Sequence, residues 1–173
     1  MTKKSIKTSE ALEAYNILNN SKYSNIEDGD KIKLWKITRA LKPIATKFEE
    51  DNKDAAEKFK ADIKDFDELL PKAQEYENLL RSNSDMSKSP IGAAEYDAFI
   101  KEFKKYNSLV GKAVEEYATK EVELSFEPLS EDAFCKLMAS NPDWKMAQVM
   151  AISEIVCEVA APAKEEPKKG KKK

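Results

Sequence analysis

The sequence contains no histidine, four glycines and two cysteines, and each of these shortages excludes a kind of site. Without imidazole, this chain alone cannot build a Ser-His-Asp or Cys-His catalytic arrangement or supply a histidine ligand to zinc. Two cysteines are too few for a four-thiolate zinc site, and four scattered glycines exclude a glycine-rich phosphate-binding loop. We therefore expect a protein that is not an enzyme and that uses no metal ion or cofactor.

Long apolar runs are also missing. No apolar run approaches the 18 residues that suggest a transmembrane helix, and no apolar signal-peptide core follows the basic residues at the N-terminus. The sequence thus predicts no membrane interaction. We expect the chain to stay in the cytoplasm of the cell that makes it.

Charged residues are abundant but unevenly distributed. They make up 36% of the 173 residues, compared with about 25% in an average soluble domain. The net charge is −2, but residues 160–173 carry six Lys and two Glu, so residues 1–159 carry −6. Residues 160–173 have no apolar side chain larger than alanine or proline, which is typical of disorder. We predict one mostly helical domain over 1–159 followed by a disordered, lysine-rich tail.

The strongest helical signal starts at Asp30, where apolar residues recur at spacings of three and four along a seam that continues to Leu70. Pro43 lies inside this seam and predicts either a kink or a break after Leu41, because proline removes a backbone donor. Pro71 predicts a second interruption. Five seam residues are candidates for an interface with a protein partner or a second copy: Leu34, Ile37, Leu41, Phe59 and Phe66.

The pattern changes after residue 120, where apolar and polar residues alternate over 121–127, as in a half-buried strand. Its only plausible partner within the chain is the segment around residues 3–7. Ser130 and Asp143 are expected to cap two short helices near the C-terminus. The predicted fold is mainly α: an elongated helical hairpin or small bundle, with a two-stranded antiparallel β clasp and a small C-terminal helical pair.

Two pairs of side chains have alternative interpretations. Trp35 and Trp144 have apolar neighbours, which favours core or interface positions over stacking on a base or sugar. Met146 and Met150 are expected to fill the core, although flexible methionines also suit surfaces that bind varied partners.

The two cysteines and an acidic turn are interpreted more simply. Cys135 and Cys157 are expected to be reduced core residues, with a disulfide or redox pair as the alternative. Asp28 and Asp30 flank Gly29 as in part of a calcium loop. The remaining ligands are missing, so a turn and helix start is the favoured interpretation.

The lysine-rich tail offers a separate function. Its candidate nucleic-acid contacts are Lys168, Lys169, Lys171, Lys172 and Lys173. Clustered lysines attract phosphates without reading sequence, and no aromatic residue is interleaved to stack on bases. The alternative is a tail that only improves solubility.

Three segments of the sequence are similar to segments of known proteins: Ser9–Leu18, Arg39–Thr46 and Val122–Ser130. Their order, with a short strand, a helical hairpin, a returning strand and small terminal helices, resembles a set of uncharacterised small proteins from bacteriophages and Bacteroides-type mobile elements. The resemblance covers most of residues 5–157 and implies no enzymatic activity. It implies a phage or mobile-element origin among virion or assembly genes, and therefore a place in the cytoplasm of the bacterial host or in a virion.

Overall fold

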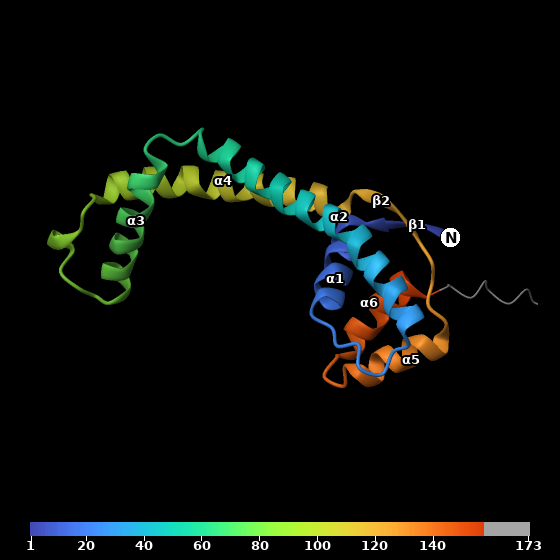
Figure 1. The fold of residues 1–173 in the computed structure, drawn as a ribbon. Helices are drawn as coiled ribbons and strands as arrows, with labels where there is room; N and C mark the ends of the chain where they lie inside the picture. Colours follow the sequence, from blue (N-terminus) through green and yellow to red (C-terminus); the bar gives the residue numbers. More distant parts are fainter. Residues whose placement is uncertain (158–173) are drawn as a thin grey trace, which may run out of the picture. The chain divides into compact units, whose positions relative to one another are not determined.

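The computed structural model describes residues 1–157 (Figure 1). The described chain is mainly helical, and its two strands form a single antiparallel sheet, which confirms the predicted fold class. The strands are β1 (Thr2–Lys7) and β2 (Glu121–Phe126). The helices are α1 (Thr8–Asn19), α2 (Asp28–Lys60), α3 (Phe66–Arg81), η1 (a 3-10 turn, Met86–Lys88), α4 (Ala93–Thr119), α5 (Glu131–Ser140) and α6 (Met146–Val156).

These elements belong to two compact units. The first contains 1–6, 10–43 and the described residues from 123 onward, and the second contains 7–9 and 44–122. Helix α2 contributes its first part to the first unit and its remainder to the second.

The first unit has an apolar core built from β1, β2, α1, the first part of α2, α5 and α6. The core residues with the least exposure are Leu18, Leu34, Ile37, Leu41, Leu124, Leu137, Ile152 and Val156. The ends of the α5–α6 pair meet where the Leu129 backbone N–H donates to the Val156 carbonyl oxygen at 2.8 Å. The Ser130 hydroxyl accepts from the Ala133 N–H, so Ser130 caps α5 as predicted.

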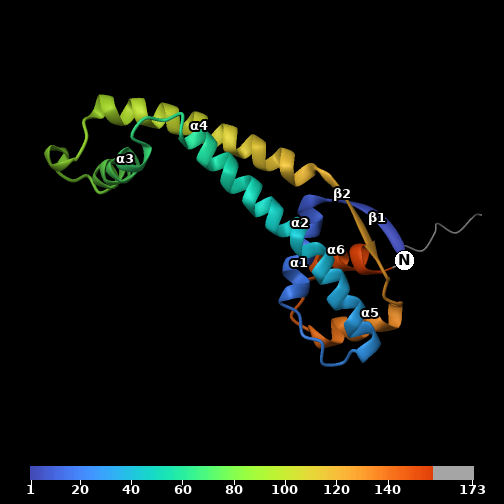
Figure 2. The same ribbon diagram turned by 45° about the horizontal axis from the view of Figure 1, so that its top comes forward.

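The second unit has a smaller core between α3 and one end of α4, and the two helices run in different directions in Figures 1 and 2. Its buried members are Ala73, Ile91 and Phe99, with half-buried aromatic side chains packed around them. Phe66 is central to this arrangement, because its ring lies 5.3 Å from that of Tyr106 and 6.1 Å from that of Phe99.

Two predicted helix boundaries are wrong, and at Pro43 one of the two predicted alternatives is excluded. Helix α2 continues through Pro43, so the predicted break after Leu41 is absent. The interruption assigned to Pro71 occurs earlier, because α2 ends at Lys60 and Pro71 lies inside α3. The last helix is capped by Lys145 rather than by Asp143, because residues 142–143 form a turn first.

Candidate functional site

The predicted interface residues on the first part of α2 lie in the core. Leu34, Ile37 and Leu41 are 1%, 1% and 0% exposed. They form one buried face of α2 in the first unit and have no surface left for a partner. The prediction that these three residues form an intermolecular interface is therefore corrected, because the chain covers the seam itself.

Phe59 and Phe66 are half-buried in the second unit. Phe66 packs against aromatic rings of α4, including Phe103 at 6.0 Å, but it is only half-buried, so its interface role stays a prediction. Phe59 stays a predicted interface residue. The tail candidates Lys168, Lys169, Lys171, Lys172 and Lys173 lie outside the described residues, and their contact with nucleic acid also stays a prediction.

The opposite face of α2 exposes large apolar side chains that the seam pattern did not predict. Ile32 is 55% exposed and Trp35 is 58% exposed. The Arg39 guanidinium carbon lies 5.3 Å from the centre of the Trp35 ring, a cation–π contact one helical turn away. Trp35 is thus a surface residue of α2. Of the two predicted alternatives for Trp35, the structure excludes a core position and leaves an interface position.

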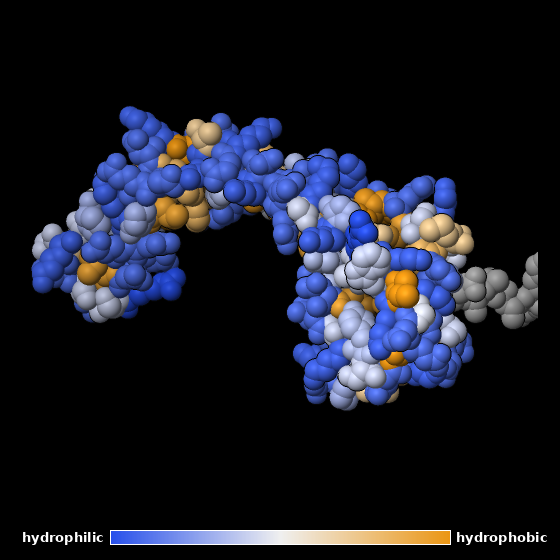
Figure 3. All heavy atoms as spheres, in the orientation of Figure 1, coloured by the Kyte–Doolittle hydropathy of each residue, from blue (hydrophilic) through white to orange (hydrophobic). Residues whose placement is uncertain are grey.

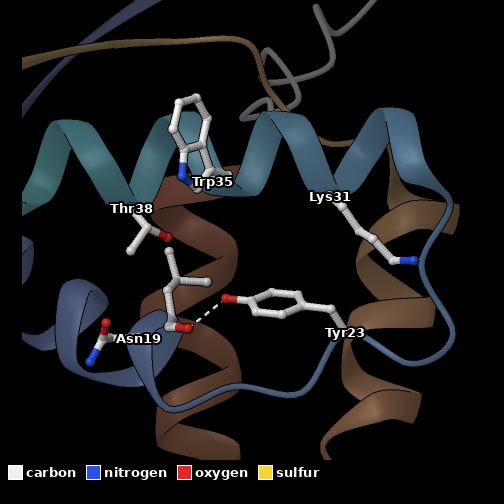
Figure 4. Close-up of a pocket in the computed structure, with 6 residues that line it drawn as sticks. Asn19, Tyr23, Lys31, Trp35 and Thr38 are labelled. Atoms are coloured by element: carbon white, nitrogen blue, oxygen red, sulfur yellow. Dashed lines mark hydrogen bonds between the residues drawn. The ribbon is translucent and has the colours of Figure 1, made fainter.

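A hollow of about 290 Å³ lies beside Trp35, between α2 and the segment that follows α1 (Figure 4). We call it the Tyr23 hollow. Figure 4 shows Lys31, Trp35 and Thr38 projecting from α2 and Tyr23 reaching in from that segment. The lining residues are Leu18, Asn19, Tyr23, Lys31, Trp35 and Thr38.

Three polar side chains around this hollow already have partners: Tyr23, Thr38 and Lys31. The Tyr23 hydroxyl donates to the Leu18 carbonyl oxygen, and burial of the ring raises the pKa of Tyr23. The Thr38 hydroxyl donates to the Leu34 carbonyl oxygen at 2.9 Å, and the Lys31 ammonium lies 3.0 Å from the Asp28 carboxylate. The hollow therefore presents mainly apolar surface, which suits an apolar side chain better than a polar ligand.

Three exposed cations surround Trp35 on α2: Lys36, Arg39 and Lys42. Within residues 1–157, none of them forms an ion pair. The two acidic residues at the start of α2 are already paired, Asp28 with Lys31 and Asp30 with Lys33, each at 3.0 Å. We call the group of Ile32, Trp35, Lys36, Arg39 and Lys42 the Trp35 surface.

Both acidic residues of the suggested calcium loop belong to the first turn of α2. This confirms the turn and helix start. Within residues 1–157, no group of three or more His, Cys, Asp or Glu side chains is placed to hold a metal ion.

The sulfur-containing side chains differ from expectation. Met146 and Met150 are 72% and 57% exposed, so the prediction that they fill the core is wrong. Helix α6 instead buries Ile152, Ile155 and Val156. Cys135 is exposed and Cys157 is half-buried, and both are free thiols. Burial, and secondarily the charge of Glu131, raises the pKa of Cys157 to about 11.

The described surface is mostly hydrophilic on the face drawn in Figure 3, where hydrophobic side chains appear in small patches. No helix within residues 1–157 combines the length and apolar character needed to cross a bilayer. Comparison of the chain with protein-family models, curated proteins and solved structures gives no match.

Proposed function

We propose that the protein is a non-enzymatic interaction protein that binds a protein partner through the Trp35 surface and the Tyr23 hollow. The observation that carries this proposal is an exposed tryptophan at the rim of a mainly apolar hollow, where the Tyr23 and Thr38 hydroxyls are already bonded to backbone carbonyls. Tryptophan and arginine are the residue types that most often dominate the energetics of protein interfaces. Burial of about 100 Å² of Trp35 would contribute about 2.5 kcal/mol to binding.

The resemblance to phage and mobile-element proteins bears on where to look for the partner. We propose that it is a protein of the same phage or mobile element, and that the complex serves assembly. This part of the proposal rests on the sequence resemblance alone.

Site-specific photo-crosslinking tests the binding surface directly. A photoreactive amino acid at Lys36, next to Trp35, should crosslink a discrete partner in cells that naturally make the chain. The same amino acid at Lys104, an exposed position on α4, is the matched control. Addition of Trp35→Ala should remove the Lys36 crosslink. Equal crosslinking from both positions, or a Lys36 crosslink that survives Trp35→Ala, would contradict the proposal.

The lysine-rich tail supports a second candidate function, sequence-independent association with nucleic acid. Its +4 charge is the supporting observation, because phosphate neutralisation makes such binding steeply salt-dependent. Deletion of residues 164–173 should then abolish retention of DNA or RNA at low salt. Retention that is unchanged by the deletion, or missing from the intact chain, would exclude this function.

A further inference from the structure

We infer that the partner presents an acidic amphipathic helix to the Trp35 surface. This inference rests on the proposed function and adds the chemistry of the partner. Residues 28–43 contain five cations and two acids, and both acids are already paired within α2. The remaining cations, Lys36, Arg39 and Lys42, are exposed on α2 within two turns of Trp35 and form no ion pair within the described residues. A carboxylate-bearing partner would supply the missing counter-charges.

The spacing along α2 fixes the pattern that this partner should show. Arg39 is one turn beyond Trp35 and Lys42 is two turns beyond it, about 6 and about 10 Å along the axis. A partner helix repeats these spacings at four and seven residues. It should therefore place one large apolar residue against the Tyr23 hollow and have Glu or Asp four and seven positions away.

The same surface suits nucleic acid less well. Arg39 lies over the Trp35 ring, and the donors of Tyr23 and Thr38 are engaged with backbone carbonyls. A base would thus find few free groups to recognise its edge. Carboxylates next to an apolar side chain match the Trp35 surface better than phosphates do.

The test uses the full isotope-labelled chain and a synthetic probe. The probe is a capped, alanine-based helical peptide of about 18 residues with one leucine and with glutamates four and seven positions after it. The control peptide has glutamines in place of the glutamates. The readout is the NMR signal of the Trp35 indole N–H, which Trp35→Phe identifies because the chain has only two tryptophans.

We expect the glutamate peptide to shift the Trp35 signal and to bind at least about tenfold more tightly than the glutamine peptide in about 50 mM salt. High salt should remove the difference, since exposed charges are screened. Arg39→Glu combined with Lys42→Glu should abolish the preference for glutamate. Lys101→Glu combined with Lys104→Glu makes the same charge change on exposed residues of α4 and should leave it intact.

The contrary outcomes separate the inference from the proposed function. Equal binding of the two peptides at the Trp35 signal would overturn the acidic partner and leave an apolar docking site in place. No response to either peptide would count against both. A response to an oligothymidine strand but to neither peptide would overturn both in favour of nucleic acid. Concentration-dependent shifts without any peptide would identify a second copy of this chain as the occupant.

Discussion

At the scale of single residues, the two cysteines show how the local environment gives identical side chains different exposure and reactivity. Cys135 is exposed on α5, whereas Cys157 is half-buried just after α6. Burial favours the neutral thiol of Cys157 and raises its pKa to about 11. Because the thiolate is the nucleophile, this shift suppresses the reactivity of Cys157 at neutral pH.

We predict that Cys157 reacts slowly with thiol reagents in a Cys135→Ser variant. With a pKa of about 11, only about one thiol in a thousand is ionised at pH 8. The rate should therefore rise about tenfold per pH unit until the pH approaches 11. A colorimetric thiol assay checks this, with the unfolded variant in denaturant as the control. Reaction of folded Cys157 at the rate of the unfolded control would contradict the assigned environment.

The same shift has a consequence for stability. An ordinary cysteine in the unfolded chain ionises near pH 9.0, before the folded chain does. Between pH 9 and about 11 the folded state thus binds more protons, and the free energy of unfolding falls as the pH rises. The contribution of Cys157 to the free energy of unfolding is fully present below pH 9 and is lost as the pH rises to about 11.

Trp35 and the methionines of α6 show what sequence reasoning misses at this scale. Trp35 was expected in a core or an interface, and apolar neighbours such as Leu34 suggested burial. The buried face of α2 runs through Leu34 and Ile37, and Trp35 lies on the other side of the helix. The angular position of each residue around the helix axis distinguishes exposed Trp35 from buried Leu34 and Ile37, whereas the composition of the segment does not. The same test applied to Met146 and Met150 would have placed them opposite the buried Ile152.

At the scale of elements, the sequence predicted types and order better than ends. The change of period at residue 121 identified β2, and the lack of another candidate paired it with the N-terminal segment. Ser130 marked the start of α5 because its hydroxyl and the acidic first turn satisfy helix-end requirements. Pro71 predicted a helix boundary in the wrong place, since the boundary lies at residues 61–65, where Asp65 has a left-handed backbone.

Asn141 connects elements in a way that its sequence neighbourhood did not reveal. Its Oδ1 accepts from the Lys22 N–H at 2.8 Å, and its Nδ2 donates to the Lys22 and Leu137 carbonyl oxygens at 2.9 Å. The side chain is buried and holds the segment after α1 against the end of α5. That segment also carries Tyr23, so Asn141 supports one wall of the Tyr23 hollow.

Asn141→Ala should lower the free energy of unfolding by about 2–3 kcal/mol, because it removes three hydrogen bonds made by a buried amide. Asn20→Ala is the control, since the Asn20 amide is exposed and bonds only within its own helix end. Its expected effect is within about 0.5 kcal/mol. Urea unfolding measures both variants. An equal decrease in the free energy of unfolding for both variants would show that the hydrogen bonds of Asn141 do not stabilise the fold.

At the scale of the whole molecule, the two compact units differ in the size of their cores. The buried cluster of the second unit has three members, with half-buried aromatic and aliphatic side chains around it. The first unit buries many more apolar side chains, drawn from six elements. Opening free energy follows the amount of buried apolar contact, so the second unit should open first.

We predict that Phe99→Ala destabilises the second unit by about 3 kcal/mol through loss of a buried aromatic ring. Hydrogen exchange read by mass spectrometry should then accelerate in α3 and α4 and stay unchanged in α5 and α6. Leu80→Ala, at a 50% exposed position of α3, should change little. Equal acceleration everywhere would show a single cooperative domain, as the sequence predicted for 1–159.

The three cations of the Trp35 surface also bear on symmetry. Two copies that met through this surface around a two-fold axis would bring Lys36, Arg39 and Lys42 of one chain close to the same residues of the other. Their combined six positive charges would oppose such a dimer. The arrangement that leaves Trp35 exposed thus disfavours pairing between identical copies and leaves the tryptophan accessible to an unlike, oppositely charged protein.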